Sequence, residues 1–119
     1  MKAWIGKTLI VIAIGHTVVG LIAFAPALKS LIKAGVINSI VVGQNPDREA
    51  AFWFLFTGFT LLAIGGLLDY LERQNLPIPP FVVIMLAILV VTGILVMPIS
   101  GFWLPIIPLF GLIWPMRRL

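Results

Sequence analysis

The chain has 119 residues, of which 61% are hydrophobic and 10% are charged, and its mean hydropathy is +1.19. Soluble domains average about 25% charged residues, so this composition excludes an ordinary soluble domain and favours an integral membrane protein. The chain has no cysteine, which excludes disulfides and thiolate metal ligands. The net charge of +4 is spread singly along the chain, so we expect no nucleic-acid binding.

Four apolar stretches predict an all-α protein, a four-helix transmembrane bundle in a single domain. The spans are expected at about residues 4–25, 50–71, 80–97 and 102–115. Each of the first two holds about 22 residues, enough to cross a hydrocarbon core of about 30 Å. Short links between the stretches favour antiparallel neighbours.

The first stretch also has some features of a secretory signal peptide, because Ala23-Phe24-Ala25 imitates a cleavage site. Pro26 would directly follow the cut, and the apolar run is longer than the roughly 7–15 residues of the apolar region in a signal sequence. We therefore interpret this stretch as a true first span.

The link after the first span is the longest, and part of it has helical spacing. Leu28, Leu31 and Ile32 recur on one side of such a helix, with Lys29 and Lys33 opposite. This pattern indicates a short amphipathic helix at about residues 27–37, lying on the membrane surface. An ordinary structured loop is the alternative.

Start and stop signals frame the later spans. Asn45 can cap the second span and Pro46 suits its first helical position, with acidic residues following in the first turn. Residues 75–80 form a stiff proline-rich link to the third span. The fourth span is short and contains Pro105 and Pro108, so it should be kinked or partly unwound, or else re-entrant.

The distribution of basic residues predicts that both termini are cytoplasmic. One side would hold Lys2, Lys7, Arg73, Arg117 and Arg118, and the other Lys29, Lys33 and Arg48. The four tryptophans, which prefer the water–lipid boundary, fall near the predicted span ends at Trp4, Trp53, Trp103 and Trp114.

The only histidine, His16, lies near the middle of the first span. It belongs to a face of mostly small residues, and the second span has a matching stripe: Gly6, Leu9, Ala13, Gly20 and Ala23 in the first, and Ala51, Gly58, Gly65 and Asp69 in the second. Small faces let membrane helices approach closely, so we expect the two spans to pack through them. His16 would then meet Thr57 or Thr60, and Thr92, at similar depth, either as a staple between helices or as a ligand or proton-handling site.

Charged residues gather at the two ends of the second span. Asp69 lies four residues before Arg73, a spacing that favours a helix ion pair, and Lys7 could also reach Asp69. This cluster is either a charged boundary or the lining of a vestibule. At the other end, Arg48 and Glu49 either belong to the helix start or hold a polar head group.

No metal-binding pair, nucleophile elbow or phosphate loop is present in the sequence, so we expect no catalytic residues, metal site or cofactor. The favoured hypothesis is a non-enzymatic membrane protein with an intramembrane pocket for a lipid or other hydrophobic small molecule. Its ligand-binding residues would be His16, Thr57, Thr60, Thr92, Arg48, Glu49 and Asp69. An oligomeric small transporter or channel, or a structural subunit of a larger complex, stays open, as does a homodimer.

Three segments together carry a resemblance to a known family. They are Gly15-His16-Thr17-Val18-Val19-Gly20, Ala50-Ala51-Phe52-Trp53-Phe54 after Asp47-Arg48, and Pro98-Ile99-Ser100-Gly101-Phe102-Trp103. The chain resembles a family of small four-helix bacterial membrane proteins whose function is unknown. The resemblance implies this architecture and a location in the bacterial inner membrane, but no mechanism and no functional residues.

Overall fold

The computed structural model describes residues 3–116, and this part of the chain is helical without any strand. Its elements are α1 (Ile5–Ala23), α2 (Ala25–Lys33), α3 (Pro46–Arg73), α4 (Pro80–Val96), the 3-10 turn η1 (Gly101–Trp103) and α5 (Ile106–Met116). The predicted all-α class is therefore confirmed. Lys2, Arg117 and Arg118, which entered the prediction of topology, lie outside the described residues.

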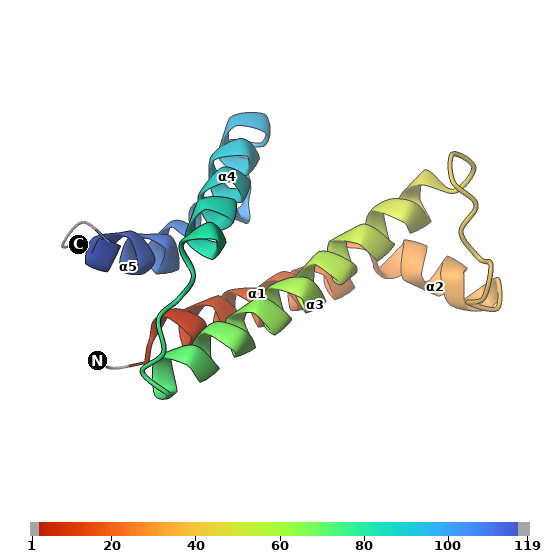
Figure 1. Cartoon of the computed structure of the whole chain (residues 1–119). Helices are drawn as coiled ribbons and strands as arrows, with labels where there is room; N and C mark the ends of the chain where they lie inside the picture. Colours follow the sequence, from red (N-terminus) through yellow and green to blue (C-terminus); the bar gives the residue numbers. More distant parts are fainter. Residues whose placement is uncertain (1–2, 117–119) are drawn as a thin grey trace.

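A hairpin of α1 and α3 forms the long body of the molecule (Figure 1). These two helices are long and apolar enough to cross a membrane, by length and composition. They meet at glycines: a Cβ atom on Gly6 would overlap the backbone of Asp69, and one on Gly65 would lie 3.0 Å from the backbone nitrogen of Ile10. The prediction that these helices pack through their small faces is confirmed, because only glycine permits such a close backbone approach.

The start of α3 follows the sequence prediction in position but not in capping. Pro46 is its first residue, and Asp47 and Glu49 stand in its first turn. Asn45 does not cap the helix with its side chain; its Oδ1 accepts a hydrogen bond from the backbone nitrogen of Val41 at 3.1 Å. The expected cap is therefore wrong, because the amide turns back to close the preceding loop.

Both α2 and α3 end in the same way, with a left-handed residue just past the helix. Gly35 has φ +91° after α2 and Asn75 has φ +53° after α3. The following backbone nitrogens, of Val36 and Leu76, donate to carbonyls five residues back at 3.2 and 2.9 Å. This motif ends a helix, so α2 stops before Gly35 and does not reach residue 37, where the predicted helix ended.

The α4 and α5 helices form a V at one end of the hairpin and do not run alongside it (Figure 1). They hold 17 and 11 residues, fewer than the roughly 20 of a typical membrane-spanning helix. A bundle of four membrane-crossing helices therefore stays a prediction.

The turn between α4 and α5 contains the Ser-Gly-Phe-Trp segment. The indole nitrogen of Trp103 donates to the carbonyl of Pro98 at 2.8 Å, and a Cβ on Gly93 would overlap the ring of Phe102. Pro105 follows η1, and α5 begins only after it. The predicted break in the fourth apolar stretch is thus confirmed in the form of a 3-10 turn followed by a short helix.

One hydrophobic core joins the V to the hairpin. Its buried members come from four helices and include Leu9, Leu68, Val83, Val90 and Leu112. On its edge the ring of Trp4 lies against Gly111 of α5, where a Cβ atom would overlap it. The core thus gathers at the end of the hairpin where α1 begins.

Candidate functional site

His16 is attached to α3 at two points. Its Nε2 lies 2.8 Å from the carbonyl oxygen of Phe54, and its ring stacks on the Phe54 ring with centroids 3.9 Å apart and an interplanar angle of 8°. A carbonyl only accepts, so Nε2 carries the proton of this bond. Gly58 makes room for the contact, because a Cβ there would lie 3.2 Å from Cδ2 of His16. This is the geometry of a staple between α1 and α3.

The structure does not bring His16 together with the threonines that were expected beside it. Thr57 and Thr60 are exposed, and their hydroxyls donate to the carbonyls of Trp53 and Phe56 in the previous turn at 2.8 and 2.9 Å. Thr92 is exposed too, and its hydroxyl donates to the carbonyls of Ile88 and Leu89. A threonine in an apolar helix satisfies its hydroxyl in this way without any neighbour, so similar depth alone did not imply contact.

A carboxylate that was not among the predicted site residues closes the other end of the hairpin. Glu72 is 7% exposed, and its two carboxylate oxygens accept hydrogen bonds from the backbone nitrogens of Ile5 at 3.2 Å and Gly6 at 2.8 Å. These nitrogens belong to the first turn of α1, where unpaired N–H groups and the helix dipole favour a negative charge. Glu72 of α3 therefore caps α1 from outside.

The sequence held a signal for this contact. The start of α1 has no serine, threonine, asparagine or aspartate at its N-cap, where Trp4 stands without a side-chain cap. A helix start that lacks a local cap needs an acceptor from elsewhere. Glu72 ends the second predicted span on the same side of the membrane as that start, which would have singled it out.

Asp69 lies one turn before Glu72 and is paired along its own helix. Its Oδ2 accepts from Nε of Arg73 at 2.7 Å, as the spacing predicted. Its other oxygen, Oδ1, is buried without a hydrogen-bond partner in the described residues. Within residues 3–116 Lys7 is exposed and forms no ion pair, so its expected contact with Asp69 does not occur. The reason is geometric: α1 meets α3 backbone to backbone at Asp69, which leaves Lys7 on the outer side.

At the opposite end of the hairpin, Arg48 connects α3 to α2 and to the loop between them. Its Nε and Nη2 donate to Oγ of Ser30 at 3.0 and 2.7 Å, and its Nη1 donates to the carbonyl of Ser39 at 2.7 Å. Glu49 instead accepts from the backbone nitrogen of Gly43 at 3.1 Å. Arg48 and Glu49 thus hold the loop by separate bonds and do not pair with each other.

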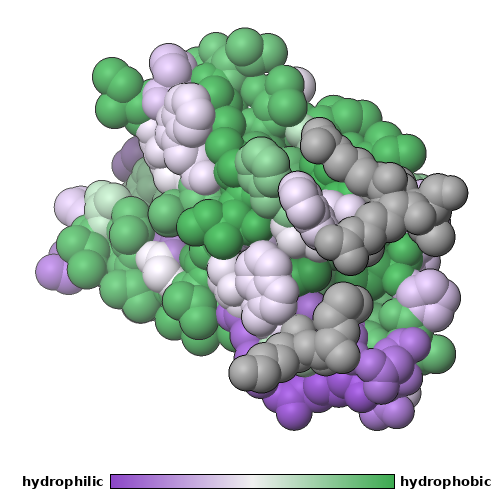
Figure 2. All heavy atoms as spheres, turned by 90° about the vertical axis from the view of Figure 1, so that its left-hand side faces the viewer, coloured by the Kyte–Doolittle hydropathy of each residue, from purple (hydrophilic) through white to green (hydrophobic). Residues whose placement is uncertain are grey.

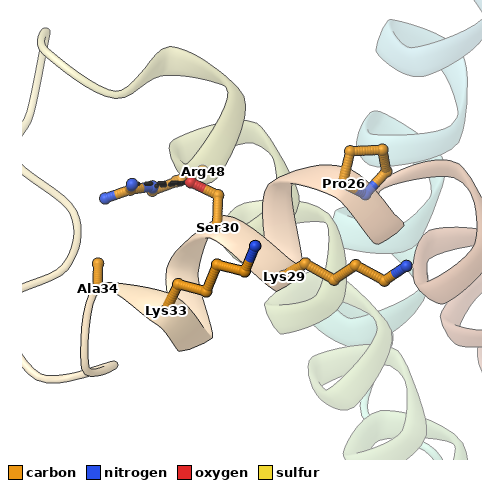
Figure 3. Close-up of a pocket in the computed structure, with 6 residues that line it drawn as sticks. All are labelled: Pro26, Lys29, Ser30, Lys33, Ala34 and Arg48. Carbon is orange, nitrogen blue, oxygen red and sulfur yellow. Dashed lines mark hydrogen bonds between the residues drawn. The ribbon is translucent and has the colours of Figure 1, made fainter.

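A shallow hollow lies where these contacts meet the α2 surface (Figure 3). Its lining is Pro26, Lys29, Ser30, Lys33, Ala34 and Arg48. Figure 3 shows both lysine side chains extended along α2 and the Arg48 guanidinium lying across Ser30. The hollow therefore combines three cationic groups with a small apolar floor.

Apart from the three threonines, the predicted site residues thus fall into three places. His16 lies within the hairpin, Asp69 at the end that Glu72 closes, and Arg48 and Glu49 at the opposite end. The residues 3–116 contain no group of three histidine, cysteine or acidic side chains that could hold a metal ion.

Comparison with known proteins identifies one relationship. No curated protein and no solved structure matches the chain. A sequence profile matches residues 1–118, which is nearly the full length. The resemblance carried by the three sequence segments is thereby confirmed, and the matching family has no known function. The chain belongs to the Family of unknown function (DUF6463).

Proposed function

We propose that this protein is a non-enzymatic integral membrane protein that binds membrane lipid. One observation carries the proposal: the α1/α3 hairpin is packed tightly within itself but exposes large apolar side chains around its outside. These include Val11, Ile14, Val18 and Ile22 of α1 and Phe52, Phe56, Phe59 and Leu62 of α3. Soluble monomers rarely expose apolar patches of more than a few hundred Å², so the natural solvent of this surface is lipid.

The surface around α4 and α5 supports the same proposal. Figure 2 shows hydrophobic residues over most of the face that contains the V of α4 and α5, with hydrophilic residues gathered mainly along its lower edge. A continuous apolar surface bordered by a polar edge is the pattern of a membrane protein near its water boundary.

Helix length is consistent with a membrane-spanning hairpin. With about 1.5 Å of rise per residue, the 19 residues of α1 extend about 28 Å and the 28 residues of α3 about 42 Å. The first length matches a hydrocarbon core of about 30 Å, and the second adds a portion that projects beyond it. We extend the proposal to a bacterial inner membrane, four crossings and cytoplasmic termini, on the basis of the apolar stretches, the resemblance and the distribution of basic residues.

The place of lipid binding differs from the one first expected. His16 and the three threonines already have hydrogen-bond partners within the protein, so they offer little to a ligand in the middle of the membrane. The cationic groups at the end of the hairpin are better placed for binding. We therefore propose a lipid contact at the membrane boundary in place of an intramembrane pocket.

Insertion is tested by single-cysteine labelling, which is clean here because the natural chain has no cysteine. Gln44→Cys and Gln74→Cys place thiols at exposed positions at opposite ends of α3. A maleimide that cannot cross membranes should label one variant from outside intact cells and the other only after lysis. Labelling of both from the same side would exclude a spanning hairpin.

Lipid binding is tested by native mass spectrometry after purification in mild detergent. We expect phospholipid to be retained equally by the natural protein and by His16→Leu, since His16 is already paired with Phe54. Protein that carries no lipid, or retention that is lost only in His16→Leu, would contradict the proposal.

A further inference from the structure

The register of the hairpin sets the depth of the cationic hollow. A Cβ atom on Gly20 would lie 2.6 Å from the ring of Phe54, so these residues stand at the same level. From that level α1 continues three residues to Ala23, about 4.5 Å, whereas Arg48 lies six residues away along α3, about 9 Å. Arg48 therefore projects about one helical turn beyond the end of α1.

This depth is that of the lipid head groups if α1 fills the hydrocarbon core. The α2 helix begins at Ala25 and carries Lys29 and Lys33 into the same zone, beside Arg48. Its apolar residue Ile32 is exposed next to them. A short helix with cations on one side and an open apolar residue on the other suits the boundary between head groups and acyl chains.

The cations of the hollow are not neutralised by the protein. Within residues 3–116 the ion pair joins Arg73 to Asp69 at the far end of the hairpin, and no carboxylate lies within 4.0 Å of the charged nitrogens of Lys29, Lys33 or Arg48. Arg48 instead donates to a serine hydroxyl and a backbone carbonyl, both of which are uncharged. Three positively charged residues thus line a hollow whose lining contains no carboxylate.

Arg48 is also held in a fixed orientation. Three of its five N–H groups are used in the bonds to Ser30 and Ser39, which leaves one N–H on each terminal nitrogen. A guanidinium with two terminal donors is suited to bind two oxygens of one phosphate, and the fixed position reduces the entropy lost on binding. The lysines add charge on flexible stems beside it.

We propose that this hollow binds the phosphate of an anionic phospholipid, with Arg48 as the oriented contact and Lys29 and Lys33 as the electrostatic ones. The inference rests on the proposed membrane location and names the class of lipid and its site. The acyl chains would run along the exposed apolar side chains at the end of α1, of which Ile22 is one.

The test measures lipid affinity by native mass spectrometry of the full chain in mild detergent. Phosphatidylglycerol and phosphatidylcholine with identical acyl chains are titrated against the natural protein, Lys33→Gln, Lys33→Arg, the double change Lys29→Gln with Lys33→Gln, and the control Lys7→Gln. Lys7 is the matched control, because it is also an exposed lysine but lies at the other end of the hairpin.

We expect the natural protein to prefer phosphatidylglycerol. Lys33→Gln should weaken the binding of that lipid about fivefold, since each basic residue near an anionic surface contributes about 1 kcal/mol. The double change Lys29→Gln with Lys33→Gln should weaken it about 25-fold. Lys33→Arg should keep the affinity, and Lys7→Gln should leave it unchanged. Circular dichroism checks that each variant is folded.

Three results would overturn the inference. Equal weakening by Lys33→Gln and Lys7→Gln would mean general charge attraction without a site. Equal affinity for the two lipids would remove the anionic preference. Displacement of bound phosphatidylglycerol by millimolar inorganic phosphate would identify a site for free phosphate and not for lipid. Each leaves the spanning hairpin standing, because the cysteine-labelling experiment tests that independently.

Discussion

The carboxylates at one end of the α1/α3 hairpin are turned into the protein, whereas the cations at the other end are turned outward. Glu72 caps the first turn of α1 and Asp69 pairs with Arg73, so both acidic side chains have partners in the protein. Arg48 has only uncharged partners and stands beside two exposed lysines. The first end joins helices; the second end presents charge to whatever surrounds the protein.

The reason for the difference lies in how the helices meet. At the Glu72 end α1 and α3 touch backbone to backbone, so the Glu72 carboxylate is removed from solvent and paired, while Oδ1 of Asp69 is buried without a partner in the described residues. At the Arg48 end α3 contacts α2 and the loop that follows it; Arg48 is partly buried there, and Lys29 and Lys33 stay exposed. Substitutions of Gly6 and Glu72 at the first end should therefore change stability, and substitutions of the exposed lysines at the second end should change binding.

The largest effect is expected for Gly6→Ile. The new side chain would overlap the backbone of Asp69, which cannot move aside as a side chain can, so we expect a loss of about 3 kcal/mol in the free energy of unfolding. Gly15→Ile is the matched control, because a Cβ there meets nothing within 4 Å. Reversible unfolding in mixed micelles measures both. A similar loss in both variants would mean that glycine itself, and not the contact, matters.

Glu72→Ala should have the next largest effect. It leaves the backbone nitrogens of Ile5 and Gly6 without their acceptor, and we expect a loss of about 2–3 kcal/mol by the same measurement. Glu72→Gln should lose less stability, since its amide oxygen still accepts a hydrogen bond. Asp47→Ala, an exposed acidic residue at the other end, should lose less than about 1 kcal/mol. Equal losses at Glu72 and Asp47 would contradict the external cap.

His16→Leu should have a moderate effect, because it removes one hydrogen bond and the stack on Phe54. We expect a loss of about 1 kcal/mol, the usual size for a polar contact between membrane helices. Thr60→Val is the control and should be nearly neutral, since its hydroxyl bonds only its own helix. An unchanged stability in His16→Leu would show that the staple contributes nothing.

Lys33→Gln should change the free energy of unfolding by less than about 0.5 kcal/mol, although we expect it to weaken lipid binding. The lysine is exposed and has no ion pair among the described residues, so folding does not depend on it. The same unfolding curve, recorded without added lipid, checks this. A loss comparable to that of His16→Leu would erase the distinction between the two ends of the hairpin.

The sequence predicted the contact between α1 and α3 better than it predicted the polar partners. Glycine spacing is a property of each helix alone, and it correctly indicated which faces would meet. The partner of His16 was not predictable in the same way, because it is a backbone carbonyl of Phe54, a group that every residue carries. Asp69 was among the predicted ligand-binding residues and Glu72 was not, yet it is the Glu72 carboxylate that bonds the start of α1.

The fourth apolar stretch shows the same division. Pro105 and Pro108 predicted a broken helix, because proline lacks the backbone N–H that a helix interior needs. The break lies at Pro105, whereas Pro108 stands in the first turn of α5, where proline is tolerated. The direction of α4 and α5 could not be predicted, because it depends on the ring of Phe102 packing on Gly93 and the ring of Trp4 packing on Gly111. These contacts join residues that are not neighbours in the chain.

By itself, therefore, the sequence determined that the chain is helical, where the long helices lie to within a few residues, which of their faces are small, and that the composition is strongly apolar. Those properties follow from local propensity, backbone restriction and composition, each of which acts over a few residues or is summed over the chain. Only the tertiary structure decided that Glu72 caps α1, that His16 bonds a carbonyl and that Arg48 is left without an anion. These depend on distances between separate helices, which hydrophobic spacing restricts but does not specify.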